Sequence, residues 1–284
     1  MKFWNSTLRS MDEYIPGEQP SNLDEYIKLN TNENPFPPSE KVMKAIIENV
    51  TPNLRRYPDS KASRVRAIFA EQNNISPENI FVGNGSDEIF TLIFRGFIEK
   101  TGLAAFPYPS YALYDTLAQG NGIKFKKIAM DKSLTVDMDK FLEEKYDMVI
   151  IANPNNPTGT YISTARIKHF LTNFKGLLVV DEAYIDFYGG SAIGLINEYD
   201  NIIVTRSFSK SYSLAGLRVG LAIANGDIIK GLLKIKDSYN VDALALAGAE
   251  AALLDTRSFE YNISMLRNNK EYLEERLSSM GFEI

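Results

Sequence analysis

The chain has 284 residues, a formal net charge of −5, and 44% hydrophobic and 24% charged residues. This balance is typical of a soluble globular protein, and the acidic net charge gives no reason to expect nucleic acid or an anionic membrane as a partner. Cysteine is absent, which excludes disulfides and thiolate metal sites and fits a reducing, cytoplasmic location. No stretch approaches the roughly 18 apolar residues of a membrane span, and the start lacks the apolar core of a signal peptide.

The first 35 residues are rich in Pro, Gly, Asn and Glu and predict an extended arm. After the arm, short apolar runs alternate with helical patterns, which predicts an α/β fold. The runs are continuously apolar, as is typical of strands buried on both faces of a mostly parallel sheet. Strands are predicted at residues 80–82, 103–106, 148–152, 177–180, 202–205 and 219–223, and helices at 87–99, 111–119, 163–173, 228–238, 243–254 and 259–280.

These elements divide the chain into three predicted parts. The arm covers residues 1–35, a large α/β domain covers 36–240, and a second, smaller domain begins in 241–284. Gly281 is a plausible helix stop, and Phe282–Ile284 could open a strand. Such a strand has no partner further along the sequence, so we expect the smaller domain to be incomplete.

Polar residues gather directly after the predicted strands. In an open α/β sheet, ligands bind outside the carboxyl ends of the strands, so these residues are expected to face one crevice. The five clusters are residues 83–88, 107–111, 153–159, 181–184 and 205–210.

The last cluster has the most specific chemistry. It places Lys210 with two hydroxyl groups, Ser207 and Ser209, at a strand end, and Arg218 follows eight residues after the lysine. A lysine whose pKa is lowered by its surroundings can act as a nucleophile toward an aldehyde. Hydroxyl groups and a guanidinium can hold a phosphate. An aldehyde and a phosphate on one small molecule describe pyridoxal 5′-phosphate (PLP).

Three other clusters supply complementary groups. Ser86 and Asp87 follow a glycine turn that opens a helix, whose free N–H groups could receive a phosphate. Tyr111 could stack on a flat ring, and the Asn156 amide could donate to a ring oxygen. Taken alone, these clusters also fit an ordinary capped turn, a packing aromatic residue and a plain loop.

Asp181 ends an apolar run, where a carboxylate is costly unless it is paired. A protonated pyridine nitrogen would be a suitable partner, although Asp181 could instead cap a helix or bind a metal. A metal is disfavoured because His169, the only histidine, lies in a helical pattern and is expected at the surface. We therefore predict no metal site.

Longer motifs resemble one enzyme family. Residues 207–220 resemble the lysine signature of class I and II aminotransferases of fold type I, which are PLP-dependent. Residues 29–36, 56–59 and 180–187 most closely resemble the histidinol-phosphate aminotransferases. The resemblance covers essentially the whole chain. It implies a mostly parallel central sheet flanked by helices, with a second, smaller domain.

The resemblance implies a role for each matching residue. Lys210 would form the internal aldimine, Asp181 would pair with the pyridinium nitrogen, and Tyr111 would stack on the ring. Tyr184 and Asn156 would bond the ring oxygen. Family members are homodimers with shared sites, so Tyr57 would reach the phosphate of the partner subunit. The phosphate would be surrounded by Ser86, Asp87, Ser207, Ser209 and Arg218.

The implied reaction is a ping-pong transamination in histidine biosynthesis, from histidinol phosphate and 2-oxoglutarate to imidazole acetol phosphate and glutamate. Family members continue beyond the position of Ile284 with an arginine that binds the acidic group of the substrate, so substrate ligands are not assigned. Two other activities of this fold remain open, namely threonine-phosphate decarboxylase and aromatic aminotransferase. A cofactor-binding module without turnover, or an α/β protein for another phosphate ligand, also remains open.

Overall fold

The computed structural model describes residues 2–11, 17–22 and 25–284. Residues 1, 12–16 and 23–24 of the predicted arm lie outside the described residues. Within the arm, α1 (Ser6–Ser10) is a short helix whose N-cap, Asn5, accepts a hydrogen bond from the N–H of Leu8. This part of the arm is therefore helical rather than extended.

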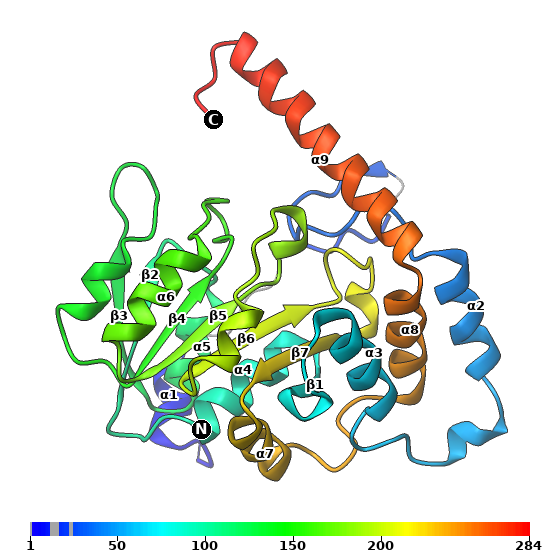
Figure 1. The fold of residues 1–284 in the computed structure, drawn as a ribbon, viewed down its shortest axis with the longest axis horizontal. Coiled ribbons are helices and arrows are strands. Elements are labelled where there is room, and N and C mark those ends of the chain that lie inside the picture. The colour runs from blue at the N-terminus through cyan, green and yellow to red at the C-terminus, as the bar shows by residue number, and fades with distance from the viewer. Residues whose placement is uncertain (1, 12–16, 23–24) are drawn as a thin grey trace.

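A seven-stranded sheet forms the centre of the molecule, in the order β1-β7-β6-β5-β4-β2-β3 (Figure 1). Strand β7 is antiparallel to both of its neighbours, and every other neighbouring pair is parallel. The predicted α/β fold with a mostly parallel sheet is therefore confirmed. The strands are β1 (Ile80–Asn84), β2 (Leu103–Tyr108), β3 (Lys124–Ala129), β4 (Met148–Ala152), β5 (Leu177–Asp181), β6 (Ile202–Ser207) and β7 (Val219–Ala224).

Strand β3 is missing from the sequence prediction. It lies at the edge of the sheet and pairs only with β2 among the described strands. Its three lysines leave no continuous apolar run, because one side of an edge strand faces water. Lysines on an edge strand also discourage pairing with other chains.

Helices cover both faces of the sheet and enclose two buried clusters. Alternate residues of one strand serve opposite faces, since Met148 and Ile150 of β4 belong to one cluster and Val149 and Ile151 to the other. Helices α4, α5 and α7 pack on the first face, and α3, α6 and α8 on the second. The helices are α2 (Glu40–Asn49), α3 (Ser63–Asn73), α4 (Gly85–Gly96), α5 (Leu113–Gly120), α6 (Thr164–Asn173), α7 (Gly226–Ile235), α8 (Ala243–Leu254) and α9 (Thr256–Ser279).

Helix α8 packs beside α2, and its buried residues belong to the same hydrophobic cluster as those of β7. The domain boundary expected at residue 241 stays a prediction. Helix α9 extends away from the body (Figure 1), and Ile263 is its one buried residue. Residues 282–284 form no strand, contrary to expectation, because no described strand lies beside them to pair with. None of the described helices is both long enough and apolar enough to cross a membrane.

Candidate active site

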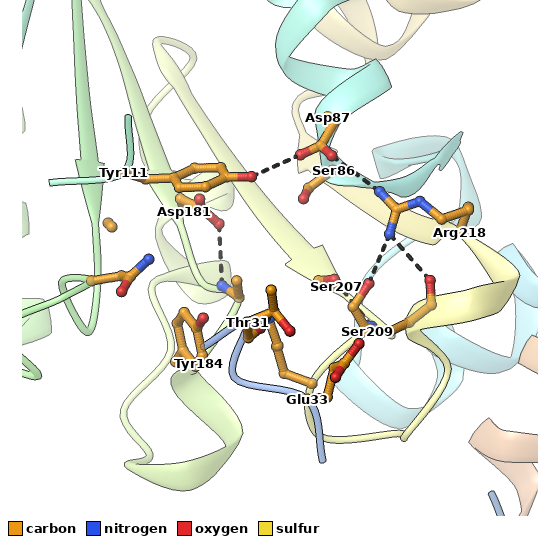
Figure 2. Close-up of a pocket in the computed structure, with 15 residues that line it drawn as sticks. Thr31, Glu33, Ser86, Asp87, Tyr111, Asp181, Tyr184, Ser207, Ser209 and Arg218 are labelled. Atoms are coloured by element: carbon orange, nitrogen blue, oxygen red, sulfur yellow. Dashed lines mark hydrogen bonds and ion pairs between the residues drawn. The ribbon is translucent and has the colours of Figure 1, made fainter. Parts of the chain in front are cut away.

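The carboxyl ends of the parallel strands meet at one edge of the sheet, where a cavity of about 300 Å³ opens (Figure 2). Because β7 runs in the opposite direction, Arg218, which directly precedes it, reaches the same edge. Ten of the eleven site residues predicted from the sequence line this cavity, and Tyr57 does not. The lining residues are Thr31, Glu33, Ser86, Asp87, Tyr111, Ala152, Asn156, Asp181, Ala183, Tyr184, Ser207, Ser209, Lys210, Ala215 and Arg218.

Lys210 lies on the loop after β6 and lines the cavity. Nζ donates to the carbonyl oxygen of Thr31 at 2.8 Å and lies 5.6 Å from the centre of the Tyr184 ring. Burial lowers the pKa of Lys210 because the charged form loses hydration. A larger fraction of the amine is therefore neutral and nucleophilic than for a lysine in water.

Asp181, the last residue of β5, presents a buried carboxylate to the cavity. Oδ2 accepts from the Tyr114 hydroxyl at 2.7 Å, and Oδ1 accepts from the Thr205 hydroxyl at 3.1 Å and the Ala183 N–H at 3.2 Å. These donors are neutral, and burial raises the pKa of Asp181 despite the hydrogen bonds. A cation placed beside this carboxylate would be strongly favoured.

The opposite side of the cavity is suited to an anion. Helix α4 begins at Gly85, so the N–H groups of Ser86 and Asp87 lie in its first turn, where no earlier carbonyl of the helix can pair with them. Arg218 bonds Asp87 Oδ2 at 3.1 Å and Ser209 Oγ at 3.3 Å (Figure 2). The carboxylate of Asp87 thus orients the guanidinium, and a phosphate would receive N–H, hydroxyl and guanidinium donors together.

Two tyrosines, Tyr111 and Tyr184, also line the cavity. Tyr111 donates to Asp87 Oδ1 at 3.5 Å, and its ring meets Tyr114 edge to face at 5.6 Å. The Tyr184 hydroxyl accepts from Asn32 Nδ2 at 3.1 Å, and burial raises the pKa of Tyr184. The Tyr184 hydroxyl therefore keeps its proton and can donate it to an oxygen of a ligand.

Tyr57 lies outside the cavity. The residue is 79% exposed, and its ring stacks on Tyr239 at 4.2 Å between centroids. Its predicted role concerns a partner subunit and stays a prediction. His169 is exposed, as expected.

The sequence did not assign three contributors to the site. Thr31 and Glu33 reach the cavity from the arm, and Tyr114 bonds Asp181 from α5. The arm contacts join residues far apart in the sequence, which no local pattern indicates. Tyr114 could have been suspected, because a carboxylate at the end of an apolar strand needs a donor.

Comparison with known proteins agrees with this geometry. The family described as aminotransferase class I and II matches residues 24–284. The chain belongs to this family. It is 40% identical, over 287 aligned residues, to the histidinol-phosphate aminotransferase of Clostridium beijerinckii, covering 100% of this chain and 80% of that protein. The histidinol-phosphate aminotransferases of Pseudomonas putida include one that is also 40% identical, of which the chain covers 82%. Within the aminotransferases the chain therefore falls in the histidinol-phosphate aminotransferase group.

Solved structures of aminotransferases share the fold. The histidinol-phosphate aminotransferase of Sinorhizobium meliloti, in complex with PLP, matches 99% of this chain and 79% of its own with a TM-score of 0.90 and 23% identity. The enzyme from Clostridium acetobutylicum matches 89% of this chain and 77% of its own, with a TM-score of 0.82 and 27% identity. The Sinorhizobium meliloti structure contains PLP.

The cavity of this aminotransferase fits PLP. Figure 2 places Asp181 and Tyr184 on one side and Arg218 with the serines on the other. One side therefore suits a protonated ring nitrogen and the other a phosphate. Lys210 lines the same cavity, and its amine, with its lowered pKa, suits the aldehyde.

Proposed function

We propose that the chain is a histidinol-phosphate aminotransferase that binds PLP and transfers an amino group from histidinol phosphate to 2-oxoglutarate. The products are imidazole acetol phosphate and glutamate. The two half-reactions follow a ping-pong order, and the reaction belongs to histidine biosynthesis. The observation that carries the proposal is the convergence of Lys210, Asp181 and Arg218 on one cavity of about 300 Å³. The 40% identity to histidinol-phosphate aminotransferases supports the substrate.

When bound, PLP supplies a ring that withdraws electrons from the substrate carbon. Asp181 would keep the ring nitrogen protonated, which maintains that withdrawal. Lys210 Nζ would be released by the incoming amine and would then accept and return the proton of the substrate carbon. Tyr184 and Asn156 would donate to the ring oxygen.

The remaining cavity residues would hold the cofactor in place. Tyr111 would cover a face of the ring. The phosphate would be bound by the N–H groups of Ser86 and Asp87, the hydroxyls of Ser86, Ser207 and Ser209, and the guanidinium of Arg218.

We also propose a cytoplasmic homodimer in which Tyr57 reaches the phosphate site of the partner subunit. The 79% exposure of Tyr57 supports this role, since much of the residue is available to another chain. The cysteine-free sequence fits a reducing compartment.

The test is chemical trapping of the lysine. After loading with PLP and reduction with borohydride, peptide mass spectrometry should find the cofactor mass on Lys210. Lys210→Ala should lose this adduct and reduce turnover of histidinol phosphate by about 10⁴-fold or more, because nucleophile and proton carrier are removed together. Lys230→Ala, at an exposed lysine in an ion pair with Asp227, is the matched control and should keep both.

Other outcomes would redirect the assignment. An adduct on another lysine, or full turnover by Lys210→Ala, contradicts the proposal. Carbon dioxide release from threonine phosphate would indicate the decarboxylase, and faster turnover of aromatic amino acids would indicate an aromatic aminotransferase. An adduct without turnover would indicate a binding module, and no adduct at all would indicate another phosphate ligand.

A further inference from the structure

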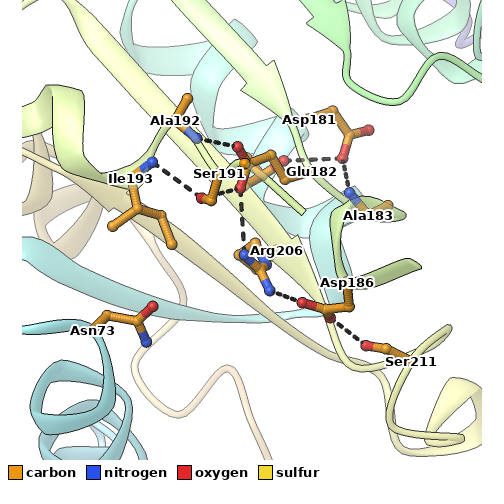
Figure 3. Close-up of polar contacts among 12 residues, drawn as sticks. Asn73, Asp181, Glu182, Ala183, Asp186, Ser191, Ala192, Ile193, Arg206 and Ser211 are labelled. Carbon is orange, nitrogen blue, oxygen red and sulfur yellow. Dashed lines mark hydrogen bonds and ion pairs between the residues drawn. The ribbon is translucent and has the colours of Figure 1, made fainter. Parts of the chain in front are cut away.

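A buried polar network lies beside the cavity but does not line it (Figure 3). It consists of Glu182, Asp186, Arg206 and Ser211, and we call it the Asp186 network. Glu182 directly follows Asp181, and Ser211 directly follows Lys210. The network therefore connects the neighbours of the two residues that the proposed reaction uses most.

The contacts of the network are continuous. Ser211 Oγ donates to Asp186 Oδ2 at 2.6 Å, and Asp186 Oδ1 accepts from Arg206 Nη2. Arg206 Nη1 lies 3.4 Å from Glu182 Oε2, which also accepts from the Ser191 hydroxyl at 2.6 Å. The side chains of Arg206 and Asp186 are each 13% exposed and that of Glu182 is 0% exposed. Buried and paired charges of this kind hold one geometry, because breaking any pair leaves a charge without compensation.

The strand positions explain how the network stays out of the cavity. Arg206 lies on β6 between Thr205, which bonds Asp181, and Ser207, which lines the cavity. Side chains of a strand alternate between its faces, so Arg206 points away from the face that its neighbours serve. A change in the network therefore acts on the site through the backbone of β6 and of the loop that follows it. This loop, residues 208–214, carries Lys210, and we call it the lysine loop.

The backbone of Lys210 is held from two directions. Asn34 Nδ2, from the arm, donates to the carbonyl oxygen of Lys210 at 2.9 Å. Asp186 holds the next residue through the buried hydroxyl of Ser211. These two contacts fix the point from which the lysine side chain starts, which limits the positions that Nζ can reach in the cavity.

We propose that Asp186 is a positioning residue for Lys210, fixing the lysine loop relative to Asp181 through Ser211 and Arg206. This inference rests on the proposed attachment of PLP to Lys210. In that attachment Nζ attacks the aldehyde carbon and one water leaves, so that a carbon–nitrogen double bond forms. The network would favour this bond by holding Nζ at the aldehyde carbon. Asp87, Tyr111 and Arg218, which would also hold the phosphate and the ring, lie outside the network and the backbone it fixes, so binding of these two groups should depend on the network less than the bond to Lys210 does.

Two cofactor forms separate these contributions. Pyridoxamine 5′-phosphate carries an amine in place of the aldehyde, so it can occupy the same ring and phosphate contacts without a bond to Lys210. Dissociation constants of PLP and pyridoxamine 5′-phosphate are measured by equilibrium dialysis for the wild type, Ser211→Ala and Asp186→Asn. We expect the PLP constant to rise about tenfold in both variants, and the pyridoxamine 5′-phosphate constant to change by less than about twofold.

Controls make the outcome specific. Ser211→Thr keeps a hydroxyl and should restore PLP binding, and Asp255→Asn, at a buried carboxylate paired with Lys41 outside the cavity, should leave both constants unchanged. Equal losses for both cofactor forms, or no loss in Ser211→Ala, would overturn the proposal. Ser211→Ala removes one hydroxyl, so it decides the matter even if Asp186→Asn does not fold. Failure of the wild type to form a Lys210 adduct would instead refute the proposed function.

Discussion

At the scale of single residues, Asp181 couples the stability of the chain to its proposed cofactor. Burial raises the pKa of this carboxyl above its ordinary 3.8. Between 3.8 and the raised pKa, the folded chain binds more protons than the unfolded chain, so the free energy of unfolding falls as pH rises through that window. At neutral pH, Asp181 without a cationic ligand therefore destabilises the fold.

Replacing this charge should stabilise the protein in the absence of PLP. We expect Asp181→Asn to raise the free energy of unfolding by about 1–2 kcal/mol near neutral pH, since an amide needs less hydration than a carboxylate. The gain should shrink as pH falls through the window, because the wild-type carboxyl then becomes neutral as well. Urea unfolding across this pH range measures the effect, and the affinity for PLP should fall in the same variant.

The control for this prediction is Asp227→Asn, which changes an exposed carboxylate of an ion pair with Lys230. An exposed pair contributes little, so the stability of this variant should stay close to that of the wild type at every pH tested. A loss of stability in Asp181→Asn at neutral pH, without PLP, would show that the hydrogen bonds of Asp181 outweigh its desolvation.

At the scale of elements, the anion side of the cavity depends on how closely α4 approaches β7. Gly220 of β7 permits this approach, because a Cβ there would lie 2.6 Å from the backbone nitrogen of Ser86 and 2.7 Å from the carbonyl carbon of Gly85. Both neighbours are backbone atoms of the first turn of α4, which cannot rotate away as a flexible side chain would. The glycine therefore supports the phosphate site from a strand that does not itself line the site.

Gly220→Ala should displace the first turn of α4 and weaken phosphate binding. We expect the dissociation constant of PLP to rise by about tenfold, which corresponds to the loss of one hydrogen bond to a charged group. Gly216→Ala is the matched control, since that glycine is exposed and a Cβ there would meet no atom within 4 Å. Equilibrium dialysis measures both variants. Unchanged PLP affinity in a normally folded Gly220→Ala protein would contradict the role of this contact.

The strands and the cavity contacts also show which features of the fold can be predicted from local sequence. Strands β4, β5 and β6 were predictable because burial on both faces requires continuous apolar runs. The placement of Lys210 in the cavity was also predictable, because the motif around it is contiguous and follows a strand end. Strand β3 and the Thr31 contact were not, because one depends on an edge position and the other on the path of the arm.

At the scale of the whole molecule, one exposed face has the character of an interface between subunits. Helix α2, its C-cap residue Val50 and the short 3-10 helix η2 (Pro52–Arg55) present four exposed apolar side chains, and α2 lies at the margin of the body (Figure 1). Their exposed fractions are 47% for Met43, 65% for Ile47, 59% for Val50 and 48% for Leu54. Grouped apolar exposure of this kind typically marks a protein interface. Tyr57 lies two residues beyond η2, so a partner seated on this face would be close to Tyr57.

The proposed homodimer therefore predicts a specific sensitivity at Ile47. Ile47→Asp would bury a carboxylate against apolar side chains of the partner, and we expect the dimer dissociation constant to rise by about a hundredfold, as at an interface hot spot. Leu273→Asp is the matched control, because Leu273 is 56% exposed on α9, the helix that extends away from the body (Figure 1). Analytical ultracentrifugation compares the three proteins. PLP affinity should fall with the dimer in Ile47→Asp, because Tyr57 would no longer reach the partner's phosphate site. A monomeric wild type, or equal dissociation in both variants, would exclude this face as the interface and remove the proposed role of Tyr57.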